Sequence, residues 1–332
     1  MPEPVPAGRF EQLADKVLAG EAPTRGEALA VLACDDDELL ALLQAAFRVR
    51  RAHFGRRVKL NMLVNAKSGL CPEDCGYCSQ SAVSTAPVER YRLLDREVLL
   101  AGAREAAARR AGTYCIVASG RRPNPRELRA VAEAVRAIKA ELPLKVCACL
   151  GLLSEADAAL LAEAGVDRYN HNLNTSSDHF AQVTTTHTYA DRLATLEAVK
   201  AAGISPCSGL IAGLGETDEQ LVDLAFALRA LDADSIPVNF LHAIDGTPFG
   251  GMPGPDPRRC LKVLALMRFV CPTKEIRVAG GREVNLASLQ PLALFAANAL
   301  FVGDYLTTAG QPPEADYRMI EDLGFEIEAC AR

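Results

Sequence analysis

The sequence of 332 residues contains no tryptophan, and aromatic residues make up only 5% of it. A core without large aromatic side chains must be filled by Val, Ile, Leu and Ala. The 49% share of hydrophobic residues is ample for that purpose. A chain of this length and composition is typical of a globular protein with one large domain or two ordinary ones.

Three further absences narrow the classes of function. No apolar run reaches the 18 or more residues of a membrane-spanning helix, so we expect no membrane partner. The stretch MPEPVPAGRFEQLADK has no basic segment followed by an apolar one, so we expect no signal peptide and a cytoplasmic location. Acidic residues outnumber basic ones, 42 to 36, and the net charge of −6 argues against nucleic acid as the main partner.

What the chain has in abundance is cysteine. It contains eleven, an odd number that is clustered along the chain. In a cytoplasmic protein this pattern indicates metal binding or redox chemistry, since disulfides are rare in that compartment. The densest group is CPEDCGYC, in which Cys71, Cys75 and Cys78 follow a CxxxCxxC spacing.

The order of apolar segments predicts the fold. Residues 9–55 carry apolar residues at helical spacing, as in FEQLADKVLAG and DDDELLALLQAAFRVRRAHFG. Further along, short β-branched runs alternate with longer amphipathic segments. We expect strands at residues 59–66, 113–119, 144–150, 167–173, 205–211, 234–241, 275–281 and 298–304.

Eight strands that alternate with helices require parallel pairing and right-handed crossovers. We therefore predict a (β/α)8 barrel of the TIM type at residues 56–332, preceded by an N-terminal helical extension at residues 1–55. A doubly wound open sheet is the alternative fold. It is less favoured because the strands number eight, are nearly regular in spacing and have no GxGxxG turn.

In such a barrel, chemistry takes place at the carboxyl ends of the strands. Alternate residues of a strand share one face, so Cys147 and Cys149 point the same way, as do Asn170 and Asn172. Polar residues on other strands are expected to line the same cavity: Cys115, Cys207, Asn239 and Arg277. His171 lies between two such asparagines, so alternation predicts that it points outward.

Two kinds of metal site compete for the CxxxCxxC group. A structural zinc site needs a second CxxC or HxxxH pair nearby, and none follows. Iron–sulfur clusters are held by closely spaced thiolates, and three of them on a four-iron cluster leave one iron open to another ligand. We therefore predict that Cys71, Cys75 and Cys78 hold a [4Fe–4S] cluster.

The same motif, after the first strand of a predicted barrel, resembles the radical S-adenosylmethionine (SAM) superfamily. That resemblance implies that SAM binds the open iron and that an electron from the cluster cleaves it to a 5′-deoxyadenosyl radical. Tyr77, before the third cysteine, matches an aromatic residue that the superfamily often has there.

Five motifs narrow the resemblance to the biotin synthases. In order along the chain they are CPEDCGYCSQS, YNHNLNTS, CSGLIAGLGET, PVNFLHAIDGTP and IRVAGGRE, and the likeness covers roughly residues 55–328. The resemblance implies sulfur insertion that converts dethiobiotin to biotin, with two SAM used per biotin and a second cluster deep in the barrel as the sulfur donor.

For the second cluster, the resemblance implies a [2Fe–2S] unit held by Cys115, Cys147, Cys207 and Arg277. Here the sequence departs from the family pattern, because KVCACLG adds Cys149 one pleat beyond Cys147. Two readings stay open. Cys149 is a packing residue, or the four cysteines together hold a four-iron auxiliary cluster with Arg277 as a hydrogen-bonding neighbour.

The resemblance also implies the ligand-binding residues. Asn170, Asn172 and Asn239 match the asparagines that bind dethiobiotin, whose ureido ring has both donors and an acceptor. Asn172, together with Tyr77, Asn174 and Arg192, is expected to contact SAM. Asn174 stands where the family often has an Asp. His187 lies near these contacts without an expected catalytic role.

The implied partners are a flavodoxin or ferredoxin as electron donor, the iron–sulfur assembly machinery and a second copy in a homodimer. Another radical SAM barrel enzyme is one alternative function, and a non-catalytic iron–sulfur carrier is another. Four cysteines have no partner at metal spacing and are expected to be packing or surface thiols: Cys34, Cys260, Cys271 and Cys330.

Overall fold

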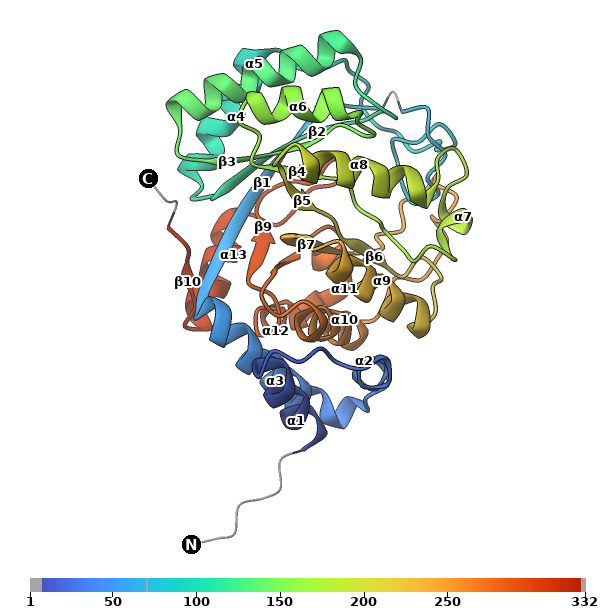
Figure 1. Ribbon diagram of the computed structural model, residues 1–332, viewed down its shortest axis with the longest axis vertical. Helices are drawn as coiled ribbons and strands as arrows, with labels where there is room; N and C mark the ends of the chain where they lie inside the picture. The colour runs from blue at the N-terminus through green and yellow to red at the C-terminus, as the bar shows by residue number, and fades with distance from the viewer. Residues whose placement is uncertain (1–7, 70, 330–332) are drawn as a thin grey trace, which may run out of the picture.

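The protein is described by a computed structural model that covers residues 8–69 and 71–329. Its centre is a closed parallel barrel, in which the first strand, β1, pairs both with β2 and with β9 (Figure 1). The strands are β1 (Arg57–Lys67), β2 (Thr113–Ala118), β3 (Lys145–Cys149), β4 (Arg168–Asn170), β5 (Ser205–Cys207), β6 (Leu210–Ala212), β7 (Ser235–Phe240), β8 (Glu275–Val278), β9 (Ala299–Phe301) and β10 (Glu326–Ile327).

Strands β5 and β6 share one position in the barrel wall. β5 pairs with β4 and β7, and β6 continues the pairing with β7. The expected strand at residues 205–211 is interrupted around Gly209, where a Cβ atom would lie only 1.9 Å from the carbonyl oxygen of Pro237. Counted this way, the described part of the barrel has eight wall positions, and the predicted TIM-type fold is confirmed.

The helices cover the outside of the barrel. The crossover and C-terminal helices are α4 (Arg96–Ala108), α5 (Pro125–Glu141), α6 (Glu155–Glu163), α7 (Phe180–Val183), α8 (Tyr189–Ala201), α9 (Asp218–Ala230), α10 (Pro257–Val270), α11 (Arg282–Leu286), α12 (Gln290–Ala293) and α13 (Pro313–Asp322). None of the described helices is long and apolar enough to cross a membrane.

Capping boxes fix where several of these helices begin. The N-cap side chains of α6, α8 and α9 are Ser154, Thr188 and Thr217, and each accepts a hydrogen bond from a backbone N–H in the first turn while a side chain three residues on reaches back. These starts follow the carboxyl ends of β3, β4 and β6. The sequence therefore determines locally where the loops around the barrel mouth end.

The N-terminal segment folds as three helices, α1 (Arg9–Leu18), α2 (Arg25–Leu32) and α3 (Leu39–Phe54), which lie below the barrel beside α10 (Figure 1). Arg50 of α3 is fully buried and donates its Nε–H to the carbonyl of Ala297, 3.0 Å away. Phe47 packs edge-on against Phe295 and Phe325. The extension thus shares the main hydrophobic core of the barrel. The division at residue 55 stays a prediction.

Candidate active site

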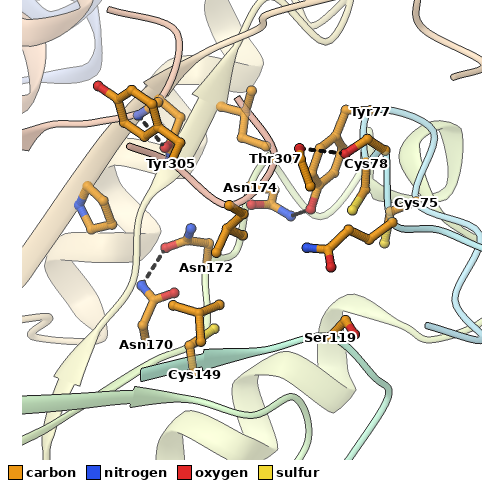
Figure 2. Close-up of a pocket in the computed structure, with 18 of the residues that line it drawn as sticks. Cys75, Tyr77, Cys78, Ser119, Cys149, Asn170, Asn172, Asn174, Tyr305 and Thr307 are labelled. Atoms are coloured by element: carbon orange, nitrogen blue, oxygen red, sulfur yellow. Dashed lines mark hydrogen bonds between the residues drawn. The ribbon is translucent and has the colours of Figure 1, made fainter. Parts of the chain in front are cut away.

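A cavity of about 400 Å³ opens inside the barrel, a size suited to a small ligand. It is bounded by the loop after β1, the carboxyl ends of the strands and the segment after β9. All the predicted site residues except Cys207 line it: Cys71, Cys75, Tyr77, Cys78, Cys115, Cys147, Cys149, Asn170, Asn172, Asn174, Arg192, Asn239 and Arg277. Cys207 is buried in the wall, where its sulfur accepts a hydrogen bond from Asn170 Nδ2, 3.3 Å away. Figure 2 shows the asparagines between Cys149 on one side and Cys75 and Cys78 on the other.

The first three cysteines stand on the loop after β1. The backbone N–H of Cys78 donates to the carbonyl of Cys75, 3.1 Å away, so a tight turn brings these two residues together. Burial raises the pKa of Cys71 and Cys75 and raises that of Cys78 to about 12. Sulfurs in such a place stay protonated unless a positively charged partner binds them.

Two acidic residues between the cysteines anchor this loop to the segment before α8. The Asp74 carboxylate accepts hydrogen bonds from Thr184 Oγ1 (2.6 Å), Thr185 N (2.9 Å) and Thr186 Oγ1 (3.0 Å). Burial works to raise the pKa of Asp74, but these hydrogen bonds outweigh it and hold the pKa well below its usual range. Asp74 therefore stays ionised and keeps the cysteine loop attached.

Glu73 continues this attachment towards Arg192. Its Oε2 atom lies 2.5 Å from Nδ1 of His187, and the Nε–H of Arg192 donates to Nε2 of the same ring, 3.0 Å away. A guanidinium can only donate, so His187 Nε2 is the acceptor and Nδ1 carries the proton that Glu73 receives. Burial, with help from Arg192, lowers the pKa of His187 and keeps the ring neutral. We call Glu73, His187 and Arg192 the relay.

The relay ends at the strand that carries the asparagines. The Arg192 guanidinium donates through Nη1 to the carbonyl of Asn172. The Asn172 side chain accepts from Asn170 Nδ2 (2.9 Å) and from the backbone N–H of Gly209 (3.0 Å). The cysteine loop and the asparagines are thus connected by one continuous chain of hydrogen bonds.

The side chains of Asn174 and Asn239 are also held by hydrogen bonds. Asn174 has a φ of 67°, a left-handed conformation that Asn tolerates, and its Nδ2 donates to the Tyr77 hydroxyl, 2.7 Å away. Asn239 uses both ends of its amide on backbone groups, since Nδ2 donates to the Leu210 carbonyl (2.9 Å) and Oδ1 accepts from the Gly280 N–H (3.0 Å).

The second set of cysteines comes from neighbouring strands. Cys115 of β2 is in register with Cys147 of β3, and the Cys147 thiol lies within hydrogen-bonding reach of both Cys115 and Cys207. The hydrogen bond with Cys147 lowers the pKa of Cys207. Cys149 lies one pleat further on, in register with Val117, and burial raises its pKa to about 12. Its side chain faces the same cavity.

Arg277 points at these sulfurs from β8. Its side chain is 1% exposed and packs over the ring of Phe301, with 4.9 Å from the guanidinium carbon to the ring centre. Nη2 donates to Glu275 Oε1 (2.6 Å) and Ser235 Oγ (2.9 Å), whereas Nε is buried with no hydrogen-bond partner among the described residues.

These donors fit iron–sulfur clusters. Among the described residues, no three His, Cys, Asp or Glu side chains surround a position for a single metal ion. The cavity instead has two sets of thiols, the ligand type that iron–sulfur clusters use, at its two ends. The buried Nε–H of Arg277 has no hydrogen-bond acceptor among the described residues. An inorganic sulfide or a thiolate at this place would supply one.

The structure corrects one expectation and adds one residue. His171 lines the cavity, and its buried Nε2 has no hydrogen-bond partner among the described residues, so the expectation that it points outward is wrong; β4 ends at Asn170, and strand alternation stops there. His187 lies beside Arg192, near the expected SAM contacts as the sequence indicated, whereas Glu73 joins the site through the relay and was missed. Glu73 lies within the cysteine motif, but no local sequence pattern indicated that its partner is His187, 114 residues away.

The cysteines without a predicted metal role lie outside the cavity. Cys34 follows α2, Cys260 is inside α10 and Cys271 is at its end, and all three are buried. All three are free thiols. Cys330 lies outside the described residues.

Two family models match the chain. The model of the radical SAM superfamily matches residues 67–228, which hold the cysteine loop and the asparagine strand. The model of the Biotin and Thiamin Synthesis associated domain matches residues 237–326, which include Asn239 and Arg277. Together they cover both sides of the cavity.

Similar solved structures show the same fold. Methylornithine synthase (PylB) superposes with a TM-score of 0.84 at 20% sequence identity, covering 95% of this chain and 97% of that one. The hydrogenase maturase HydG from Carboxydothermus hydrogenoformans superposes with a TM-score of 0.81 at 19% identity, covering 97% of this chain and 80% of that one. At such identities the likeness concerns the fold alone.

Curated relatives are far closer in sequence. The biotin synthase of Geobacillus kaustophilus is 66% identical, covering 95% of each chain, and that of Bacillus pumilus is 63% identical, covering 97% of each. Identity at this level along nearly the full length means that this chain belongs to the biotin synthase family of the radical SAM superfamily.

Proposed function

We propose that the protein inserts sulfur between two carbons of dethiobiotin to form biotin, and that it uses two SAM per biotin. The observation that carries this proposal is the single cavity that has a three-thiol loop at one end, a second thiol set at the other and asparagines between them. A substrate held by the asparagines lies within reach of both ends.

Each side chain then has a binding task. Cys71, Cys75 and Cys78 hold a [4Fe–4S] cluster, and Asn172, Asn174, Tyr77 and Arg192 hold SAM. Asn170, Asn172 and Asn239 bind dethiobiotin through amide groups that both donate and accept. When bound, the clusters supply an electron for SAM cleavage at the mouth and sulfur in the interior. The protein orients the reactants and excludes water.

The auxiliary cluster is the four-iron type, held by Cys115, Cys147, Cys149 and Cys207. Two contacts support this reading over a [2Fe–2S] cluster with Arg277 as the fourth ligand. Cys149 faces the cavity beside the other thiols, and Arg277 already donates to Glu275 and Ser235, which leaves its Nε for a hydrogen bond. Arg277 is then a neighbour of the cluster.

Iron content after anaerobic reconstitution tests the cluster type. Four plus four irons per chain support the larger cluster, and four plus two contradict it. Cys149→Ser is expected to lower the count and abolish biotin formation. The matched control is Cys271→Ser, which changes a buried cysteine outside the cavity and is expected to leave both unchanged.

The reaction also needs components that the chain lacks. A flavodoxin or ferredoxin supplies electrons, the iron–sulfur assembly machinery builds the clusters, and two chains pair as a homodimer. The cytoplasm provides the reducing conditions that the ten free thiols among the described residues require.

The decisive experiment is an anaerobic reaction of reconstituted protein with SAM, a reductant and dethiobiotin, followed by mass spectrometry. Biotin with about two 5′-deoxyadenosines per biotin is the expected result. 5′-Deoxyadenosine without biotin overturns the substrate assignment and leaves the radical SAM chemistry standing. If neither product forms at full iron loading, the iron–sulfur carrier is the better reading.

A further inference from the structure

Next to the second set of cysteines lies a group of buried charged side chains, of which only Arg277 has a role in the proposed function. Glu275 of β8 accepts hydrogen bonds from Arg277 Nη2 (2.6 Å), Arg168 Nη1 (2.8 Å) and Lys59 Nζ (3.2 Å). Ser235 Oγ donates to the same carboxylate, 2.9 Å away. We call Lys59, Arg168, Arg277 and Glu275 the basic floor.

The strands place the basic floor beside the sulfurs. Arg168 is in register with Cys147 across the β3–β4 pair. Arg277 and Lys59 are both in register with Ala299 of β9, so they flank that strand at one level. Asn170 follows Arg168 on the same strand face, towards the mouth.

The charges of the basic floor do not balance. Three cations surround one carboxylate, so the group carries a net charge of two positive units, and none of its members is more than 9% exposed. Burying uncompensated charge is costly, because water no longer solvates it. Asp234 interacts with Arg168, but it is half-exposed and paired with Lys274. A further anion is needed to complete the site.

The cysteine sulfurs are where that anion belongs. Arg277 and Arg168 both interact electrostatically with Cys115 and with Cys207. A four-iron cluster with four thiolate ligands is a dianion in its oxidised form, which equals the surplus of the basic floor, whereas a [2Fe–2S] cluster with three thiolates carries only one negative charge.

We propose that the basic floor is the fixed counter-charge of the auxiliary cluster and sets its reduction potential. This inference rests on the proposed function, since it requires a cluster at the second thiol set. Reduction adds an electron to the cluster, and nearby positive charge stabilises the added electron. The net charge of the floor therefore decides how easily this cluster is reduced.

Three variants change that net charge in opposite directions. Arg168→Met lowers it to one positive unit, and Glu275→Gln raises it to three. The double variant Arg168→Met/Glu275→Gln restores two positive units with different side chains. We expect the potential of the auxiliary cluster to fall in the first, rise in the second and return near the original value in the double variant. Lys59→Met should shift it down by less, since Lys59 contacts the cluster region only through Glu275, Arg168 and Arg277.

The measurement is a redox titration of the reconstituted full chain, followed by visible absorption and EPR. It is repeated with Cys71, Cys75 and Cys78 changed to Ala, so that the auxiliary cluster alone titrates. Circular dichroism and iron content show that each variant is folded and loaded. If Arg168→Met does not load, the pair Lys59→Met and Glu275→Gln decides by the opposite signs of their shifts.

The outcomes separate the two proposals. Opposite shifts that cancel in the double variant support the counter-charge. Shifts of the same sign, or a double variant worse than either single one, mean that structural damage governs the potential and overturn the counter-charge while biotin formation stands. Absence of any second cluster in the unchanged protein overturns both.

Discussion

Cys71, Cys75 and Cys78 stand on a loop, whereas Cys115, Cys147 and Cys207 stand on neighbouring strands of the barrel wall. The loop is attached by side-chain hydrogen bonds. The carboxylates of Asp74 and Glu73 accept most of them from residues of the segment before α8. The strand cysteines are positioned chiefly by backbone pairing. One cysteine set therefore depends on many weak polar contacts and the other on the sheet.

The charges around the two sets differ as well. At the mouth, Glu73 forms an ion pair with Arg121 and is linked to Arg192 through His187. In the interior, three cations surround Glu275. A partly exposed mouth suits a cluster whose open iron must bind and release a small molecule. A buried positive surplus suits a cluster that stays in the barrel.

The largest expected effect is that the two cysteine sets serve different parts of the reaction, SAM cleavage at the mouth and sulfur insertion in the interior. Cys75→Ala removes a ligand at the mouth and should abolish both 5′-deoxyadenosine and biotin. Cys147→Ala removes a ligand in the interior and should abolish biotin while SAM cleavage continues. Both products are measured by mass spectrometry in one anaerobic assay. If Cys147→Ala stops SAM cleavage too, the two ends of the cavity do not act separately.

A smaller effect is expected from the relay at the mouth. His187→Ala leaves the Nε–H of Arg192 without its acceptor and should weaken SAM binding about tenfold, the usual worth of a hydrogen bond to a charged group. SAM binding is followed by the change in the EPR spectrum of the reduced mouth cluster. The potential of the auxiliary cluster should not move.

Two variants control for that result. His187→Gln retains a side-chain oxygen that can accept from Arg192 and should recover most of the affinity for SAM. His53→Ala changes an exposed histidine on α3, far along the chain from the relay, and should have no effect. Equal losses in the Ala and Gln variants would show that the relay does not position Arg192.

The smallest effect concerns stability. Thr188→Ala removes the N-cap side chain of α8, the helix that carries Arg192, and should lower the free energy of unfolding by about 1 kcal/mol. Denaturant unfolding of the chain measures the loss. SAM affinity should change little, because the relay still holds Arg192. A large loss of affinity would mean that the helix start, and not the relay, sets the position of Arg192.

The sequence by itself determined the barrel and most of the cavity. Alternation of β-branched and amphipathic segments indicated all eight wall positions, because a parallel barrel repeats one local pattern. Strand alternation brought Cys147 and Cys149 to one face for the same reason. His171 escaped this rule, since alternation ends where β4 ends.

Only the tertiary structure decided which charges meet. Glu275 is 216 residues from Lys59 and 107 from Arg168, and Glu73 is 114 residues from His187. No local pattern encodes such pairs, because they depend on how strands far apart in the chain are ordered around the barrel. The cysteines were identified from the sequence. The net positive charge of the basic floor next to them depends on the closure of the barrel, which brings Lys59, Arg168, Arg277 and Glu275 together.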